Sequence, residues 1–278
     1  MSRAAVAQQT QVARRSSATR LRIREGLIRV GPIVALIVIW QAAVSFGLAN
    51  PEFLPSPYSI IVATIDLARG GELFSNLWTT LLTTYGGLVI ATVIGVPLGF
   101  LMAKFKAVDG FFGPLVKATY SLPKSALVPL LFLWFGIGMK TNMTVVVLAC
   151  LLPILIYTYH GVHAVPKILI WSAQAMGTPQ RKIFLNVVLP ASMHAVLTGL
   201  RIALGFAFVL AVSAEMIAAS RGIGKLMVLY GESGAYDYMF AAVVAVVIVA
   251  YFSDRALNAV SNYILRWDEA VHATASHA

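Results

Sequence analysis

The sequence predicts an all-α membrane protein with six transmembrane helices. Of its 278 residues, 59% are hydrophobic and only 12% are charged, and the mean hydropathy is +0.82. A soluble domain of this length has too small an interior to bury that much apolar surface. A helix needs roughly 20 apolar residues to cross about 30 Å of hydrocarbon, and six runs approach this length. They lie at about 28–48, 77–103, 113–135, 143–162, 195–219 and 239–265.

The basic residues predict which way the chain crosses the membrane. Six spans place both termini on one side, and Lys and Arg concentrate on the cytoplasmic side of membrane proteins. With the N-terminus inside, thirteen Lys and Arg residues fall on the inner side and four on the outer side. We therefore expect a basic cytoplasmic tail over 1–27, a six-helix membrane domain over 28–265 and a cytoplasmic tail over 266–278. An organellar transit peptide over 1–24 is the less favoured alternative to a bacterial tail.

The composition argues against several classes of function. The net charge of +10 comes largely from the edges of the spans, without interleaved aromatic side chains, so nucleic acid is not an expected partner. The single cysteine, Cys150, excludes a disulfide framework. His160 and His163 lack a third metal ligand. No Ser/His/Asp set or carboxylate pair suggests a catalytic centre, so we expect no catalytic residue and no metal site.

The chain also lacks a phosphate-binding loop of the form Gly-x-x-x-x-Gly-Lys-Ser/Thr. At 136–141 the lysine stands one place too far from the glycine. At 222–226 the hydroxyl residue and the upstream glycine are missing. We therefore expect no cofactor to bind this chain, and any ATP to be used by a separate subunit.

A polar segment at about 165–192 interrupts the apolar runs between the fourth and fifth spans. We expect a first helix to begin at Pro166 and to end at Gly177, which can adopt the left-handed conformation. Thr178 and Pro179 then predict the start of a second helix, by side-chain capping and by proline in its first turn. Connections in helical bundles usually have about 2–8 residues, so a segment this long is expected to dock on another molecule.

The second helix of this segment is predicted to be amphipathic. Arg181 and Lys182 lie nearer the polar face. Pro190 cannot donate the next helical hydrogen bond, so we expect the helix to bend or stop there. The apolar face is formed by Ile183, Phe184, Val187 and Val188.

Four stretches resemble permeases of the nitrate/sulfonate/taurine class of ABC importers. They are the Pro-Ser-Pro sequence at 55–57, SLPKSALVPLLFLWFGIG at 121–138, the loop WSAQAMGTPQRKIFLNVVLP at 171–190, and the region from LPASMHAVLTGLRIALG at 189–205 to AEMIAASRGIGKL at 214–226. The resemblance extends over about 55–266. The loop is similar to the cytoplasmic coupling loop of ABC importers generally, in which a glycine precedes a terminal Leu-Pro by the same spacing.

This resemblance implies a fold, partners and a function. The fold is the type I ABC importer permease fold with cytoplasmic coupling helices, in a bacterial inner (plasma) membrane. The expected partners are two ABC ATP-binding subunits, a second permease copy in a homodimer, and a periplasmic or extracellular solute-binding protein. The chain would import a small, often anionic solute such as nitrate, a sulfonate or taurine; relatives also carry pyrimidine-type vitamin precursors.

The same resemblance assigns positions for coupling to the ATPase. The family's motif begins Glu-Ala-Ala, whereas this chain has Trp-Ser-Ala at 171–173. The acidic contact to the ATPase is therefore absent, and Trp171 is expected to anchor the loop by packing. The coupling candidates are Trp171, Ser172, Ala173, Gly177, Thr178, Arg181, Leu189 and Pro190.

Three charged residues inside the spans are candidates for the translocation path. Ionisable groups at this depth are costly and usually face protein or water. Arg201 and Glu215 lie about 21 Å apart along the fifth span, too far to pair with each other. Lys124 lies where two prolines predict a broken or kinked third span, and could meet an anionic solute there. The alternative is that Lys124 snorkels to an interface or pairs within the fold.

Other patterns have structural interpretations. Ser56 and Pro57 predict the start of a short amphipathic helix that ends at the glycine pair 70–71. Five small or helix-bending residues in the second span predict close helix packing, and Asp254-Arg255 predicts a contact between helices. The five are Gly86, Gly87, Gly95, Pro97 and Gly99.

Two other functions remain open at the level of sequence. A stand-alone channel or secondary transporter would need no ATPase, and a membrane-embedded enzyme would need a catalytic set. The loop at 165–192 separates the first of these from an importer subunit, because only the importer requires it to dock on an ATPase.

Overall fold

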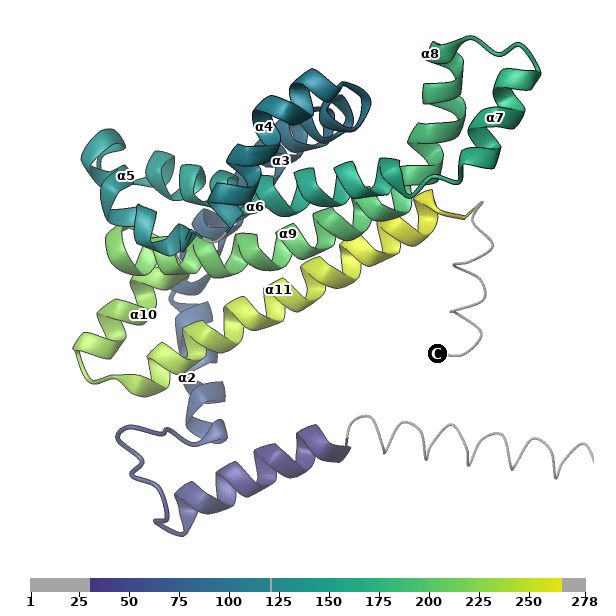
Figure 1. Ribbon diagram of the computed structural model, residues 1–278. Helices are drawn as coiled ribbons and strands as arrows, with labels where there is room; N and C mark the ends of the chain where they lie inside the picture. The colour runs from purple at the N-terminus through teal and green to yellow at the C-terminus, as the bar shows by residue number, and fades with distance from the viewer. Residues whose placement is uncertain (1–30, 121, 267–278) are drawn as a thin grey trace, which may run out of the picture. The chain divides into compact units, whose positions relative to one another are not determined.

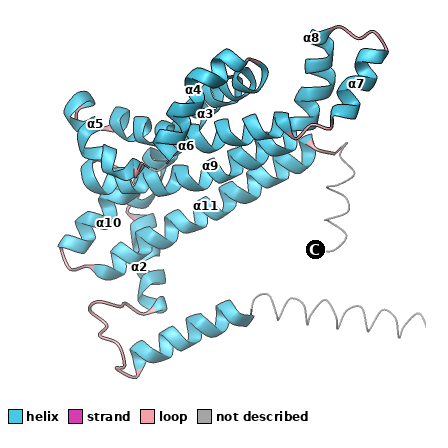
Figure 2. Ribbon diagram, viewed as in Figure 1, coloured by secondary structure: helices cyan, strands magenta, loops and turns pink. Residues whose placement is uncertain are grey.

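The computed structural model describes residues 31–120 and 122–266, and every regular element in them is helical (Figure 2). The predicted tail at 1–27, the start of the first span, and all of the predicted tail at 266–278 except Arg266 lie outside the described residues. The chain divides into two compact units, 1–63 and 64–278, which are treated separately. The first contains the helix Gly31–Ser45 and the beginning of α2 (Pro57–Arg69).

The start and end of α2 match the prediction. Its first turn is capped by Ser56, whose hydroxyl oxygen accepts a hydrogen bond of 3.1 Å from the Ser59 amide. Within the first unit, the Gln41 side chain also accepts a hydrogen bond of 3.3 Å from the Tyr58 amide. The helix ends at Arg69, and Gly71 follows with a φ of +76°.

Within its described residues, the second unit contains four helical segments that are long and apolar enough to cross a membrane. They are α3 (Glu72–Lys104), α6 (Met139–His163), the continuous segment Gln180–Ile217, and α11 (Tyr236–Ile264). These correspond to the second, fourth, fifth and sixth predicted runs. In the first run, the described helix Gly31–Ser45 is shorter than a full crossing.

The third predicted run is not one continuous helix. The chain forms α4 (Lys106–Tyr120), then the 3-10 turn η1 (Lys124–Leu127), then α5 (Val128–Phe135). Pro123 separates α4 from η1 with extended backbone, φ −70° and ψ 103°. The ring of a proline cannot donate a helical hydrogen bond and crowds the residue before it. The predicted break near the middle of this run is therefore confirmed.

The helix α6 packs along both α3 and α9 (Leu189–Ala218). Glycines make these contacts close, as predicted for the second span. A methyl group added at Gly99 of α3 would lie 2.7 Å from Thr158 Cβ, and one added at Gly95 would lie 3.0 Å from Ile154 Cγ2. On the other side of α6, a methyl group at Gly199 of α9 would lie 2.5 Å from Tyr157 Cβ. These three helices form the centre of the unit.

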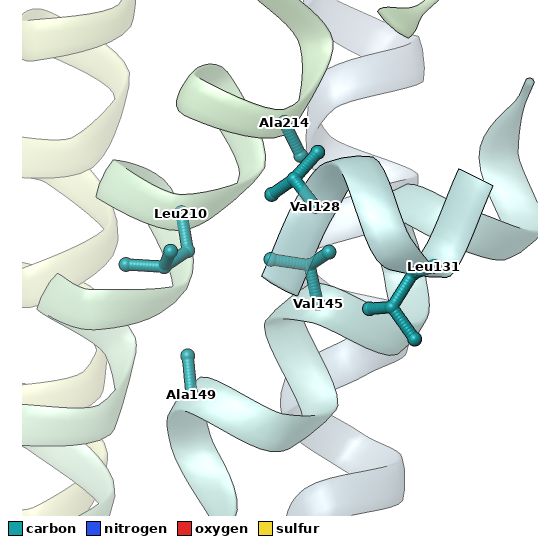
Figure 3. Packing of buried hydrophobic residues seen from close by; sticks show 6 residues of the cluster. All are labelled: Val128, Leu131, Val145, Ala149, Leu210 and Ala214. Carbon is teal, nitrogen blue, oxygen red and sulfur yellow. The ribbon is translucent and has the colours of Figure 1, made fainter. Parts of the chain in front are cut away.

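A buried apolar cluster joins α5 to this centre (Figure 3). It has two residues from each of α5, α6 and α9, so the broken third run still packs on the long helices. Figure 3 shows the side chains converging between the three elements. The members are Val128, Leu131, Val145, Ala149, Leu210 and Ala214.

Within the second unit, the short helices lie at opposite ends of α9 (Figure 1). The helices α7 (Lys167–Ala175) and α8 (Gln180–Ile183) form a hairpin at its N-terminal end. The helix α10 (Ile223–Glu232) packs beside the other end and contacts α11. Any mechanical signal from the hairpin to α10 therefore has to pass along the long helices.

Candidate functional site

The turn between α7 and α8 has the geometry that the glycine predicts. Gly177 has a φ of +73°. Its amide donates to Gln174 O at 2.9 Å, and the Thr178 amide donates to Ala173 O at 3.1 Å. This pair of hydrogen bonds is the Schellman motif, which satisfies the last carbonyl groups of a helix and requires a left-handed residue. The predicted end of the first helix at Gly177 is confirmed.

The hairpin has its own small hydrophobic core. The four residues predicted to share the apolar face of the second helix all contribute to it. Ala173 is buried at 5% exposure, so this coupling candidate faces the inside of the hairpin and not its surface. The core consists of Val165, Ala173, Ile183 and Val188, with Val162, Ile170, Phe184 and Val187 packed against them.

The other coupling candidates are divided between the surface and the base of the hairpin. Trp171 is 60% exposed, and Met176, beside the turn, is 77% exposed. Ser172, Gly177 and Arg181 are also exposed. Thr178, Leu189 and Pro190 are half-buried. The surface of the hairpin therefore combines large apolar side chains with a basic one.

Two details of the second helix differ from the prediction. It begins at Gln180 with Pro179 as its N-cap and no side-chain capping bond, so Thr178 does not cap it. Of the predicted bend or stop at Pro190, the structure shows no stop, because α8 continues into α9, but the segment changes direction between α8 and α9 (Figure 1). Five residues, Phe184–Val188, form the π-helical turn η2, in which the Leu189 amide donates to Phe184 O. The wider turn moves the hydrogen-bonding register, and α9 starts with proline in its first turn, where no amide is needed.

A cation–aromatic contact connects the hairpin to the end of α3. The rings of Phe100 and Phe184 meet edge to face with 5.4 Å between their centroids. The ammonium group of Lys104 lies 5.3 Å from the centroid of the Phe184 ring. Both arrangements are attractive for aromatic rings. The hairpin therefore touches α3 as well as continuing into α9.

A buried polar network occupies the opposite end of the same helices. Glu215 of α9 is fully buried, and its Oε2 accepts hydrogen bonds from the Thr80 hydroxyl at 2.8 Å and the Gly224 amide at 3.0 Å. Thr80 Oγ1 accepts a bond of 2.9 Å from the Ile223 amide, and Asn76 Oδ1 accepts one of 2.8 Å from the Gly222 amide. The first amides of α10 are thus capped by side chains of α3 and α9.

Glu215, proposed as a path residue from the sequence, therefore joins three helices in the protein interior. A methyl group added at Gly222 would meet its carboxylate, which explains a glycine there with a φ of +123°. Sequence reasoning missed the partners on α3. A signal for them exists, because the polar residues of the second span recur on one helical face. They are Asn76, Thr80, Thr83 and Thr84.

The tip of α10 has a further link to α3. The Tyr230 hydroxyl donates a hydrogen bond of 2.7 Å to Glu72 Oε2. Burial, together with the neighbouring Glu72 carboxylate, raises the pKa of Tyr230 to about 12. The phenol therefore stays protonated and keeps its role as donor throughout the physiological range.

The other two path candidates have different surroundings. Arg201 forms a two-point ion pair with Asp254 of α11, at 2.6 and 2.8 Å. This confirms that Asp254 supports a contact between helices. Lys124 donates a hydrogen bond of 2.9 Å to Tyr120 O and lines a cavity of about 510 Å³ between the broken third run, α6 and α9. The structure therefore brings none of the three candidates together.

The sequence of this chain matches the family described as binding-protein-dependent transport system inner membrane component, over residues 95–265. That match covers more than half of the chain. The chain belongs to this family. It is a multi-pass inner-membrane protein and a permease subunit of an ABC importer.

Individual relatives are consistent with this family. The permease is 29% identical to the taurine transport system permease protein TauC of Escherichia coli over 249 residues, covering 88% of this chain and 90% of that protein. It is also 29% identical to the putative aliphatic sulfonates transport permease protein SsuC of Escherichia coli, covering 90% and 96%. A chain of the inward-facing MetNI methionine ABC transporter shares the fold, with a TM-score of 0.60, 20% identity, and coverage of 71% and 98%.

Proposed function

We propose that this permease imports a small anionic solute of the nitrate, sulfonate or taurine class, driven by ATP hydrolysis in partner subunits. The single observation that carries the coupling part of this proposal is the α7–α8 hairpin. It has its own core, yet it leaves Trp171 and Met176 exposed on a segment that continues directly into a long apolar helix. Large exposed apolar side chains beside a basic one are typical of a protein contact.

The hairpin is the proposed contact with an ABC ATP-binding subunit. Trp171 and Met176 would enter a cleft on that subunit, with Arg181 and Ser172 at the rim. Gly177 would hold the turn that presents them. Because Leu189 and Pro190 start α9 without a break, movement of the docked hairpin would be transmitted to α9.

The family supports the kinds of partner in the assembly. ABC importer permeases work with ATP-binding subunits and a solute-binding protein. We infer that two permease copies form a homodimer and that two ATP-binding subunits bind to it. One periplasmic or extracellular solute-binding protein completes the assembly. We further propose six spans within 28–265, with 1–27 and 266–278 in the cytoplasm. The first span would include the helix Gly31–Ser45, and the third span would be formed by the broken segment from α4 to α5.

The proposed solute class is supported by the similarity to TauC and SsuC, whose names specify taurine and aliphatic sulfonates. Of the three charged candidates for the path, Lys124 is the one that lines a large cavity. Arg201 and Glu215 already have protein partners, Asp254 and Thr80, and we assign them to helix packing.

The coupling proposal is tested by placing a negative charge on the hairpin surface. In the assembled importer, Trp171→Glu and Met176→Glu are expected to abolish ATP-driven uptake and to lower co-purification of the ATP-binding subunit, with the permease still inserted. Ala107→Glu, at an exposed position between the second and third spans on the inner side, is the matched control and should retain uptake. Normal uptake by a variant that lacks 167–186 would instead favour a stand-alone channel or secondary transporter.

A further inference from the structure

A second cavity, of about 250 Å³, lies between α3, the start of α6 and the link from α9 to α10. Its volume is several times the roughly 30 Å³ that one water molecule occupies in the liquid. The side chains that line it include Thr79 and Thr83 of α3, Asn142 of α6, and Ser220 and Arg221 of the link. It is separate from the hairpin and from the cavity beside Lys124.

The charge at this cavity is positive. Arg221 is exposed, and among the described residues it has no ion pair or hydrogen-bond partner. The first turn of α6 also borders the cavity, through Gly138 and Met139, and has no side-chain cap. Uncapped amides at a helix start and an arginine both favour an anion. None of the described residues that line the cavity is acidic.

Asn142 supplies the cavity with a buried hydrogen-bond acceptor to which no described residue donates. Its side chain is 3% exposed, and its Oδ1 has no hydrogen-bond partner within the described part of the chain. Two neighbouring hydroxyls are already used, since Thr83 donates to Thr79 O and Thr141 donates to Gly136 O. A buried acceptor without a donor is costly. A ligand that carries a donor would satisfy it.

We propose that this cavity binds a small organic anion that also carries a hydrogen-bond donor, the chemical class of the aminoalkanesulfonates. Arg221 and the first turn of α6 hold the oxyanion, and Asn142 Oδ1 accepts from the ammonium group. The site rests on the proposed import of a small anion and adds the residues that contact it. In the proposed topology, Arg221 is on the outer side, where a solute-binding protein delivers its cargo.

The test measures protection of an introduced cysteine in the complete importer, reconstituted in vesicles without ATP. Ser220→Cys places a thiol at the exposed rim, while the single native cysteine, Cys150, is buried. A membrane-impermeant methanethiosulfonate is expected to label position 220 from outside. Millimolar taurine should slow labelling several-fold, and ethanesulfonate, which lacks the amine, should slow it less.

Two further variants assign the contacts. In the Ser220→Cys background, Arg221→Met should remove protection by both compounds, whereas Asn142→Leu should remove only the advantage of taurine. Lys140→Met is the matched control, because Lys140 is an exposed cation in the first turn of α6 that does not line the cavity, and protection should persist.

Three outcomes would overturn this site: no external labelling, no protection by taurine in the parent variant, or equal protection after Arg221→Met. Each can occur while the importer still takes up solute with ATP. Conversely, loss of the proposed function would appear as absent ATP-driven uptake by the unmodified complex. The two failures are therefore distinguishable.

Discussion

Glu215 of α9 and Thr80 of α3 are joined by a buried hydrogen bond of 2.8 Å, although 135 residues separate them. The same carboxylate accepts from the Gly224 amide, so one side chain holds α3, α9 and α10 together. Its other oxygen, Oε1, has no hydrogen-bond partner among the described residues. The hydrogen bonds of Oε2 therefore fix where α3, the end of α9 and the start of α10 meet, which is beside the proposed anion site.

Replacing Glu215 with leucine is expected to destabilise this corner. The substitution leaves the buried Gly224 amide without an acceptor, and an unsatisfied buried donor costs about 1–3 kcal/mol. Thermal unfolding of the detergent-solubilised protein should show a lower midpoint. Met216→Leu, at the exposed neighbouring position, serves as the control and should leave the midpoint unchanged. An equal midpoint for both variants would contradict the structural role of Glu215.

The glycine contacts between α3 and α6 should not tolerate a larger residue. A methyl group at Gly99 would lie 2.7 Å from Thr158 Cβ and 2.9 Å from Leu155 O. Such overpacking costs about 1–3 kcal/mol, so Gly99→Ala should lower the unfolding temperature. Gly205→Ala on α9 meets nothing within 4 Å and should be neutral or stabilising, because alanine is the better helix former. The reverse order of stability would contradict this packing.

Gly177→Ala is expected to weaken the hairpin without unfolding the membrane helices. The left-handed conformation costs a residue with a side chain about 1–2 kcal/mol, and the Schellman bonds depend on it. Limited proteolysis should cut more rapidly within 167–186, while the melting of the whole protein changes little. Gly110→Ala, on α4 with nothing within 4 Å, is the control. Unchanged protease resistance would show that the turn does not require glycine.

The ion pair between Arg201 and Asp254 predicts that exchanging both charges restores part of what either single exchange loses. Either Arg201→Asp or Asp254→Arg places like charges together, and each should lower the yield of folded protein. Both side chains are more than a third exposed, at 49% and 36%, so we expect a moderate effect. The double exchange should recover part of the yield. If recovery is absent, the pair does not contribute to helix packing.

The contact between Phe100 and Phe184 predicts a second mechanical route from the hairpin. The helix α3 touches the hairpin at one end and α10 at the other. Weakening the Phe100–Phe184 contact should therefore reduce the transmission of hairpin movement along α3 to α10. Phe100→Ala is expected to reduce the solute imported per ATP hydrolysed, while co-purification of the ATP-binding subunit is retained. Phe111→Ala on α4 is the control. Unchanged efficiency in both variants would leave α9 as the sole route.

Local patterns in the sequence predicted the local elements. Long apolar runs yielded four continuous helices, Ser56 capped α2, and Gly177 ended α7, because each depends on residues a few positions apart. The apolar face of the second hairpin helix was likewise readable from its spacing. The family resemblance followed from motifs of the same kind.

Other features depended on which helices meet. Nothing near Pro190 in the sequence indicates that a π-helical turn lets the helix continue, since that turn is stabilised by the hairpin core and by the contact with Phe100. The sequence indicated that Arg201 and Glu215, as charged residues inside a span, need polar partners. It did not indicate which ones, because Asp254 and Thr80 lie 53 and 135 residues away. The sequence by itself therefore determined the class, the helices and the hairpin. The tertiary structure alone decided the roles of these charges, because a charge takes its role from the groups packed against it.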